Sequence, residues 1–140
     1  MKKPQTLAQT IASRCSIIGK SGCLAFVYIW CMGLDPEDGE AIRIVADAMR
    51  ADTIKEDCTV YAEPFLERLT GKHWTVEKRK IRSLDEVKDI ERCAVLYSND
   101  GRNGHWVGVE KGNIAFNSID FSINVEDGMP ISARIIKLKE

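Results

Sequence analysis

The sequence lacks the features that mark several common classes of protein. Its net charge is −1, from 20 basic and 21 acidic residues, so it has no surplus of positive charge for binding nucleic acid. The longest apolar run, residues 24–32, is too short to span a bilayer. No long apolar stretch follows the charged N-terminus, so we expect no signal peptide and no membrane partner. Together these absences predict a cytoplasmic protein.

Cysteine and glycine are also placed in ways that exclude particular sites. The five cysteines are odd in number and irregularly spaced, which is typical of a reducing compartment rather than of a disulfide framework. There is no CxxC pair and no Cys/His cluster with zinc spacing, so we expect no metal and no cofactor. A phosphate-binding loop at Lys20-Ser21 is excluded because that motif needs glycine where Arg14 stands. The basic run at residues 78–82 is interpreted as a solvated strand end.

The order of the predicted elements indicates an α+β fold in a single domain, residues 1–140. A chain of 140 residues with 44% apolar content suffices for one hydrophobic core. Helices come first, in a layer that covers about residues 4–72, and mostly antiparallel strands follow in a layer that covers about 73–140. The predicted helices are 4–18, 21–32, 35–49, 63–70 and 83–90. The predicted strands are 74–80, 92–98, 105–110, 113–118 and 133–138.

Capping signals set the predicted helix boundaries. Residues 19–22 form a cluster of turn residues, so we expect a loop there, with Ser21 as the N-cap of the second helix and Gly33 as its stop. The apolar residues of that segment would also suit a buried strand, but the short interval between cap and glycine favours a helix that is apolar on all sides. Asp35 is expected to cap the third helix, and Gly71 to end the fourth.

Two residues suggest thiol chemistry. Cys23 is predicted in the first turn of a helix, where free backbone N–H groups and the positive end of the dipole favour thiolate over thiol. His105 is predicted to open a strand. The chain has only one other histidine, so His105 is the main candidate for the base that takes the thiol proton. A third group usually orients such an imidazole through its other ring nitrogen. Asn117 is the first candidate for that group, and Asp120 is the second.

The segments around these residues resemble those of papain-like cysteine peptidases. GCLAF, residues 22–26, is similar to the nucleophile segment of that family. GHWV, residues 104–107, followed by Asn117-Ser118, is similar to the family's base strand and the asparagine-serine pair after it. The chain length and the long interval between cysteine and histidine are more similar to compact bacterial members, such as the peptidases that cleave double-glycine leaders. The resemblance implies a papain-like fold, with the active site in a cleft between the helical layer and the sheet.

The resemblance further implies a cysteine hydrolase, a peptidase or amidase, that acts on a peptide or acyl-amide substrate through an acyl-enzyme. Cys23 would be the nucleophile, His105 the general base and later acid, and Asn117 the orienting group. Two positions depart from the family pattern: Ile17 stands where the family has an oxyanion-stabilising glutamine, and Leu24 where it has tryptophan. Three alternatives stay open: an inactive binding protein on the same fold, an acyltransferase that uses the same Cys–His pair, and an unrelated α+β module.

The strand register decides whether Asn117 can reach His105. If Lys111-Gly112 is a strict two-residue turn, Asn117 points to the face opposite His105. A three-residue loop with Gly112 in the left-handed conformation moves Asn117 to the His105 face. The sequence permits both registers.

Overall fold

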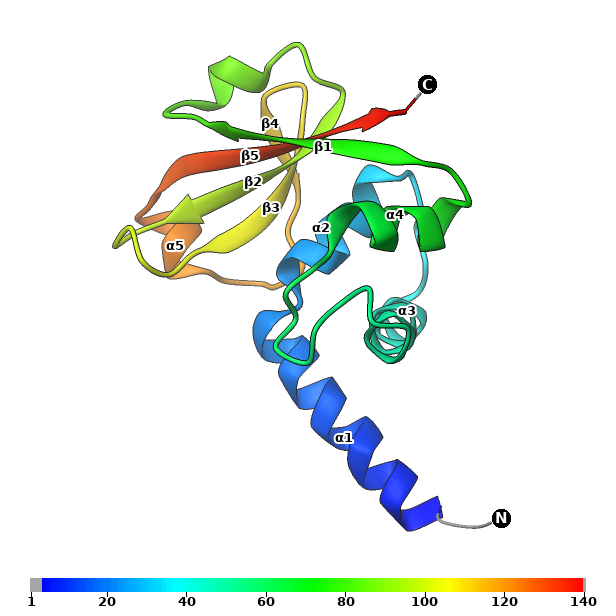
Figure 1. Cartoon of the computed structure of the whole chain (residues 1–140). Helices are drawn as coiled ribbons and strands as arrows, with labels where there is room; N and C mark the ends of the chain where they lie inside the picture. Colours follow the sequence, from blue (N-terminus) through cyan, green and yellow to red (C-terminus); the bar gives the residue numbers. More distant parts are fainter. Residues whose placement is uncertain (1–3, 140) are drawn as a thin grey trace.

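The chain adopts an α+β fold in the computed structural model, which describes residues 4–139 (Figure 1). The helices, including the 3-10 helix η1, are α1 Pro4–Ser21, α2 Cys23–Cys31, α3 Asp38–Arg50, α4 Ala62–Thr70, η1 Leu84–Val87 and α5 Ile123–Glu126. The strands are β1 Trp74–Lys80, β2 Arg92–Ser98, β3 His105–Glu110, β4 Asn113–Phe116 and β5 Met129–Leu138. Within the described residues, no helix has the length and apolar character needed to cross a membrane.

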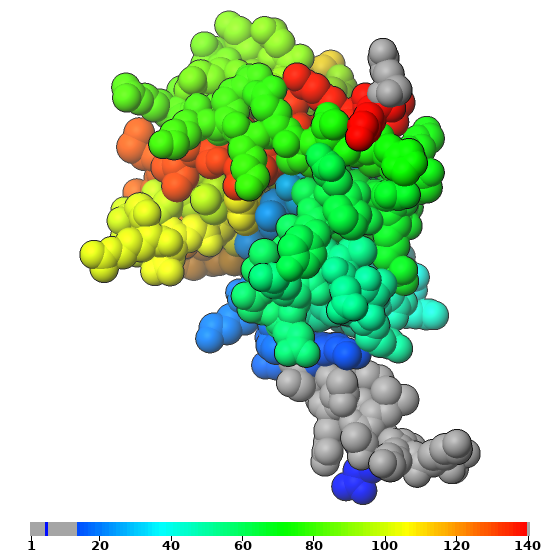
Figure 2. All heavy atoms as spheres, viewed as in Figure 1, coloured from blue at the N-terminus to red at the C-terminus, as the bar shows by residue number. Residues whose placement is uncertain are grey.

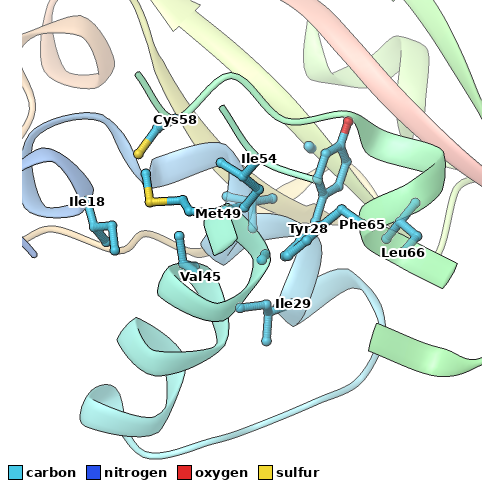
Figure 3. Close-up of a cluster of buried hydrophobic side chains, with 13 residues drawn as sticks. Ile18, Tyr28, Ile29, Val45, Met49, Ile54, Cys58, Phe65 and Leu66 are labelled. Carbon is cyan, nitrogen blue, oxygen red and sulfur yellow. The ribbon is translucent and has the colours of Figure 1, made fainter. Parts of the chain in front are cut away.

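The five strands form one open antiparallel sheet in the order β1-β5-β2-β3-β4. One face of the sheet packs on the helical layer through a core that includes Tyr28 and Phe65, shown in Figure 3. The other face carries a second core, including Val95 and Val107, which η1 and α5 cover. Strand residues of alternate parity therefore enter different cores, as the period-2 geometry of strands requires.

Several sequence-based boundaries are confirmed. The first three strands begin and end at the predicted residues. Gly71 ends α4 with φ +72°, the left-handed conformation that glycine adopts at little cost. Ser83 and Glu86 form a reciprocal capping box at the start of η1, so the predicted short capped helix exists, although only residues 84–87 are helical.

The loop predicted between the first two helices is wrong. Helix α1 continues through Gly19 to Ser21, and Gly22 alone separates it from α2. The Gly22 amide still donates to the Ile18 carbonyl at 2.8 Å, so the helical bonding hardly breaks. Ser21 is not the N-cap, because Gly22 occupies that position without a side-chain bond. A Cβ at Gly22 would lie 2.5 Å from the Ile18 oxygen, so glycine is what lets the two helices join directly.

Three further boundaries differ from prediction. The third helix begins at Asp38 with Glu37 at the N-cap and no side-chain capping bond, so the prediction that Asp35 caps it is wrong. The last strand begins at Met129 rather than at residue 133 because its first residues pair with the end of β2. Strand β4 ends at Phe116, two residues earlier than predicted.

The turn between β3 and β4 is the two-residue form. Lys111 has φ +49° and Gly112 has φ +78°, so both central residues are left-handed, as in a type I′ turn. Glu110 and Asn113 pair directly across it. This turn alone would direct Asn117 away from His105.

A β-bulge in β4 reverses that consequence. Gly108 pairs with Phe116, whereas Val109 pairs with Ile114, so Ala115 is an extra residue without a cross-strand partner. Neither predicted register is therefore correct as a whole. The extra residue shifts the parity of everything after it, and this shift brings Asn117 to the His105 side.

Candidate active site

The ends of three elements meet at one place. Cys23 is the first residue of α2, His105 is the first residue of β3, and Asn117 follows the last residue of β4. Helix α2 lies close against the sheet because Gly108 has no side chain: a Cβ there would lie 2.5 Å from the Trp30 ring. The close packing of α2 on β3 sets the position of the cysteine relative to the histidine.

Asn117 holds the His105 ring in a defined orientation. Asn117 Oδ1 lies 2.7 Å from His105 Nε2, and the same oxygen accepts the Ile119 amide N–H at 3.3 Å. An amide N–H can only donate, so the Ile119 contact fixes the oxygen, and not the nitrogen, of the Asn117 side chain toward the ring. Nε2 must then carry a proton, which leaves Nδ1 of His105 for Cys23.

The Cys23 thiol is half-buried, and its surroundings favour the thiolate. Burial by itself would raise the pKa of Cys23. Hydrogen bonding to the His105 side chain, the Trp106 backbone N–H, the charge of His105 and the Leu24 backbone N–H together outweigh burial and lower the pKa below its ordinary value. The position of Cys23 at the start of α2 acts in the same direction through the helix dipole.

The pKa of His105 shifts the opposite way. The side chain is 7% exposed, and burial alone would lower its pKa. Hydrogen bonds to Cys23 and Asn117, together with the charge of Cys23, raise the pKa above its ordinary value. A lowered thiol pKa beside a raised imidazole pKa is the combination that favours a thiolate–imidazolium pair.

The structure therefore brings together the three residues expected from the sequence, Cys23, His105 and Asn117. Asp120, the second candidate for orienting the imidazole, lines a hollow near Asn117, but the bond to Nε2 is made by Asn117. Ile17 lies on α1 and packs its side chain against the helical core, so it supplies no polar group to the site. In residues 4–139, no group of three or more His, Cys, Asp or Glu side chains is placed to hold a metal ion.

Two hollows open on either side of the cysteine and histidine, and both residues line both of them. The first, the Arg134 hollow, measures about 840 Å³ and lies between the sheet, α2 and residues 57–64. In Figure 2, mid-blue atoms of the segment around residues 20–30 are visible between the sheet and the teal-to-green segment that follows α3. The second, the Asn117 hollow, measures about 670 Å³ and carries apolar side chains such as Phe26 and Trp30.

Sequence reasoning missed the polar residues of the Arg134 hollow. Tyr28, Lys78 and Arg134 come from α2, β1 and β5, so only the assembled sheet brings them near the cysteine. One signal was present in the sequence: Arg134 interrupts an otherwise apolar strand end between Ala133 and Ile135.

Comparison with protein-family models, with curated proteins and with solved structures found no match.

Proposed function

We propose that this protein is a papain-like cysteine hydrolase, a peptidase or amidase that works through an acyl-enzyme. One observation carries the proposal: the His105 ring is bonded to Asn117 at 2.7 Å through Nε2, while its remaining nitrogen is left for the Cys23 thiol. The arrangement of the layers supports it, because the cysteine opens a helix and the histidine opens a strand of an antiparallel sheet. A thiol nucleophile requires its base within hydrogen-bond reach, and these two element starts bring Cys23 and His105 into such contact.

The first half of the proposed reaction forms the acyl-enzyme. The Cys23 thiolate attacks the substrate carbonyl carbon, a C–S bond forms, and the carbonyl electron pair moves onto oxygen. The oxyanion then re-forms the C=O bond as the C–N bond breaks, and the His105 imidazolium donates its Nδ1 proton to the leaving amine, which leaves a thioester on Cys23. Asn117 keeps the ring oriented throughout, because its oxygen holds the Nε2–H.

The second half releases the acyl group. The neutral imidazole of His105 takes a proton from water at Nδ1, and the hydroxide formed attacks the thioester carbonyl. The C–S bond breaks, a carboxylic acid leaves, and Cys23 returns to the thiolate. Each histidine protonation change in this cycle occurs on the nitrogen that faces the cysteine.

The oxyanion of both tetrahedral intermediates needs hydrogen-bond donors. The first backbone N–H groups of a helix have no partner inside the helix, and Cys23 supplies such a group at the start of α2, whereas the Leu24 N–H already bonds to the Cys23 sulfur. Ile17 adds no side-chain donor. Lys20 and Ser21, at the end of α1, are polar side chains that line the same hollow as Cys23.

A peptide-library digestion tests the proposal. The protein is incubated with a defined mixture of peptides, and new termini are identified by mass spectrometry. Wild type is expected to produce new termini and a transient acyl adduct on the Cys23 peptide, and Cys23→Ala neither. Asp120→Asn is the matched control and is expected to retain cleavage. Hydroxamates formed with added hydroxylamine, without cleavage in its absence, would indicate an acyltransferase instead. A wild-type protein that forms no adduct would contradict the proposal.

A further inference from the structure

Arg134 lines the Arg134 hollow, and its guanidinium has no ion-pair partner among the described residues. Its guanidinium carbon is 4.9 Å from the centre of the Trp106 ring, and Nη1 donates to Ser132 Oγ at 2.8 Å. These contacts hold the group in place and leave its other N–H donors without a protein acceptor within the described part of the chain. A guanidinium held on an aromatic face with free donors is well suited to bind a carboxylate in a bidentate way.

A second cation stands beside Arg134. Lys78 is its direct partner across the β1–β5 ladder, and both side chains line the hollow together with Cys23. For residues 4–139, no carboxylate lies within ion-pair distance of either cation, although neighbouring Arg79 pairs with Glu77 at 2.8 Å. Two unpaired like charges side by side repel each other, so an anion between them would be stabilised.

The Tyr28 hydroxyl is a third hydrogen-bond donor, and Tyr28 lines the same hollow as Arg134 and Lys78. The residue as a whole is only 1% exposed, but its hydroxyl is not a buried unpartnered atom: it has no hydrogen-bond partner among the described residues and lies at the accessible surface of the hollow. Figure 3 shows the ring within the apolar cluster and the hydroxyl oxygen directed out of it. Burial raises the pKa of Tyr28 to about 12 despite the nearby charge of Arg134, so the hydroxyl stays protonated and can donate. Because Tyr28 lines the hollow, its hydroxyl can donate to a ligand bound there.

We propose that Arg134, Lys78 and Tyr28 form an anion subsite that binds a carboxylate of the substrate beside Cys23. This inference rests on the proposed function, since it places the carboxylate within a substrate whose carbonyl reaches the cysteine. The carboxylates of Asp57 and Glu63 also line the hollow, but among the described residues neither forms an ion pair with Lys78 or Arg134. The substrate class is therefore a peptide or amide with an acidic group near the bond that is cut.

Two alkylating probes that differ by one charge test the subsite without requiring turnover. N-iodoacetyl-β-alanine carries a carboxylate, and N-iodoacetyl-β-alaninamide replaces it with a neutral amide. In both, the Cys23 thiolate displaces iodide and forms a thioether, which is followed on the Cys23 peptide by mass spectrometry. For wild type, we expect the acid to label about tenfold faster than the amide, as a charge-assisted hydrogen bond would give. In Arg134→Gln, this ratio is expected to fall to about one.

Two further subsite variants and one control variant separate the subsite from a general effect of net charge and from misfolding. Lys78 is exposed, so Lys78→Gln preserves the fold and is expected to lower the ratio severalfold. Tyr28→Phe removes only the hydroxyl and is expected to lower it as well. Lys88→Gln makes the same change of net charge at an exposed ion pair with Asp85 and is expected to leave the ratio unchanged.

The neutral probe distinguishes the two proposals. If it labels Cys23 in wild type with an ordinary thiol pKa, the proposed function fails. Alternatively, the neutral probe labels a thiolate of low pKa. In that case the subsite is refuted, and the hydrolase proposal stands, if the ratio of acid to amide labelling rates is near one in wild type. The same conclusion follows if that ratio is unchanged in Lys78→Gln and Arg134→Gln.

Discussion

Replacing Gly108 with alanine is expected to destabilise the protein and to disturb the candidate site together. The new Cβ would lie 2.5 Å and 2.6 Å from two atoms of the Trp30 ring and 3.0 Å from Phe116 Cβ. Trp30 cannot simply rotate away, because it stacks on Phe116 and lies under the Arg92 guanidinium. The guanidinium carbon of Arg92 is 4.3 Å from the centre of the Trp30 ring. Either Trp30 leaves this stack or α2 moves off the sheet.

The size of the effect follows from these contacts. Overpacking a close contact costs about 1–3 kcal/mol. Weakening the Arg92–Trp30 interaction adds about 0.5–1 kcal/mol. We therefore expect a loss of about 1.5–4 kcal/mol in the free energy of unfolding, measured by urea denaturation followed by circular dichroism, and a fall in Tm of about 10 °C. Because α2 carries Cys23, the pKa of that thiol is also expected to rise toward its ordinary value.

The same substitution elsewhere provides the control. Gly39 lies in α3, and a Cβ there meets nothing within 4 Å. Gly39→Ala is therefore expected to stabilise the protein by about 0.4–1 kcal/mol, because alanine restricts the unfolded chain. A Gly108→Ala protein as stable as wild type, or a Gly39→Ala protein destabilised equally, would refute the reasoning.

Three further changes test the site. Asn117→Ala removes the acceptor of the buried His105 Nε2–H. We therefore expect a loss of about 1–3 kcal/mol in unfolding free energy and slower alkylation of Cys23 at neutral pH. Unchanged values would exclude Asn117 as the orienting group. Asp120→Asn is expected to leave the pH profile of alkylation unchanged, and a shifted profile would make Asp120 the orienting group instead. Gly22→Ala forces a Cβ to within 2.5 Å of the Ile18 oxygen, so we expect about 1–3 kcal/mol of destabilisation in urea, whereas wild-type stability would mean that the helix junction adapts.

Local signals predicted much of the fold. Alternation of residue type predicted β1, and β2 and β3 were also predicted with their observed bounds; each of these strands has at least one face in a core. The conformational requirement at Gly71 and the capping box at Ser83 are local chemistry, so they could be recognised without tertiary information. The same holds for the placement of Cys23 near a helix start and His105 at a strand start.

The parts that were missed depend on contacts between distant segments. The bulge at Ala115 is decided by how β4 continues along β3 beyond a two-residue turn, which no residue pattern at the turn reveals. The near-continuous junction of α1 and α2 depends on the absence of a side chain at Gly22, although the surrounding residues are typical of a turn. Tyr28 and Arg134 meet in one hollow only because α2 packs across the sheet.

The most direct test of the central claim is the pH dependence of Cys23 alkylation by iodoacetamide in wild type and in His105→Ala. Labelling requires the thiolate, so its rate rises with pH through the thiol pKa. The account predicts a wild-type midpoint below the free-thiol value of about 8.5. It also predicts a higher midpoint in His105→Ala, since the burial that raises the pKa remains while the histidine that lowers it is gone. Equal midpoints in the two proteins, at or above the free-thiol value, would contradict the account and make Cys23 a structural cysteine.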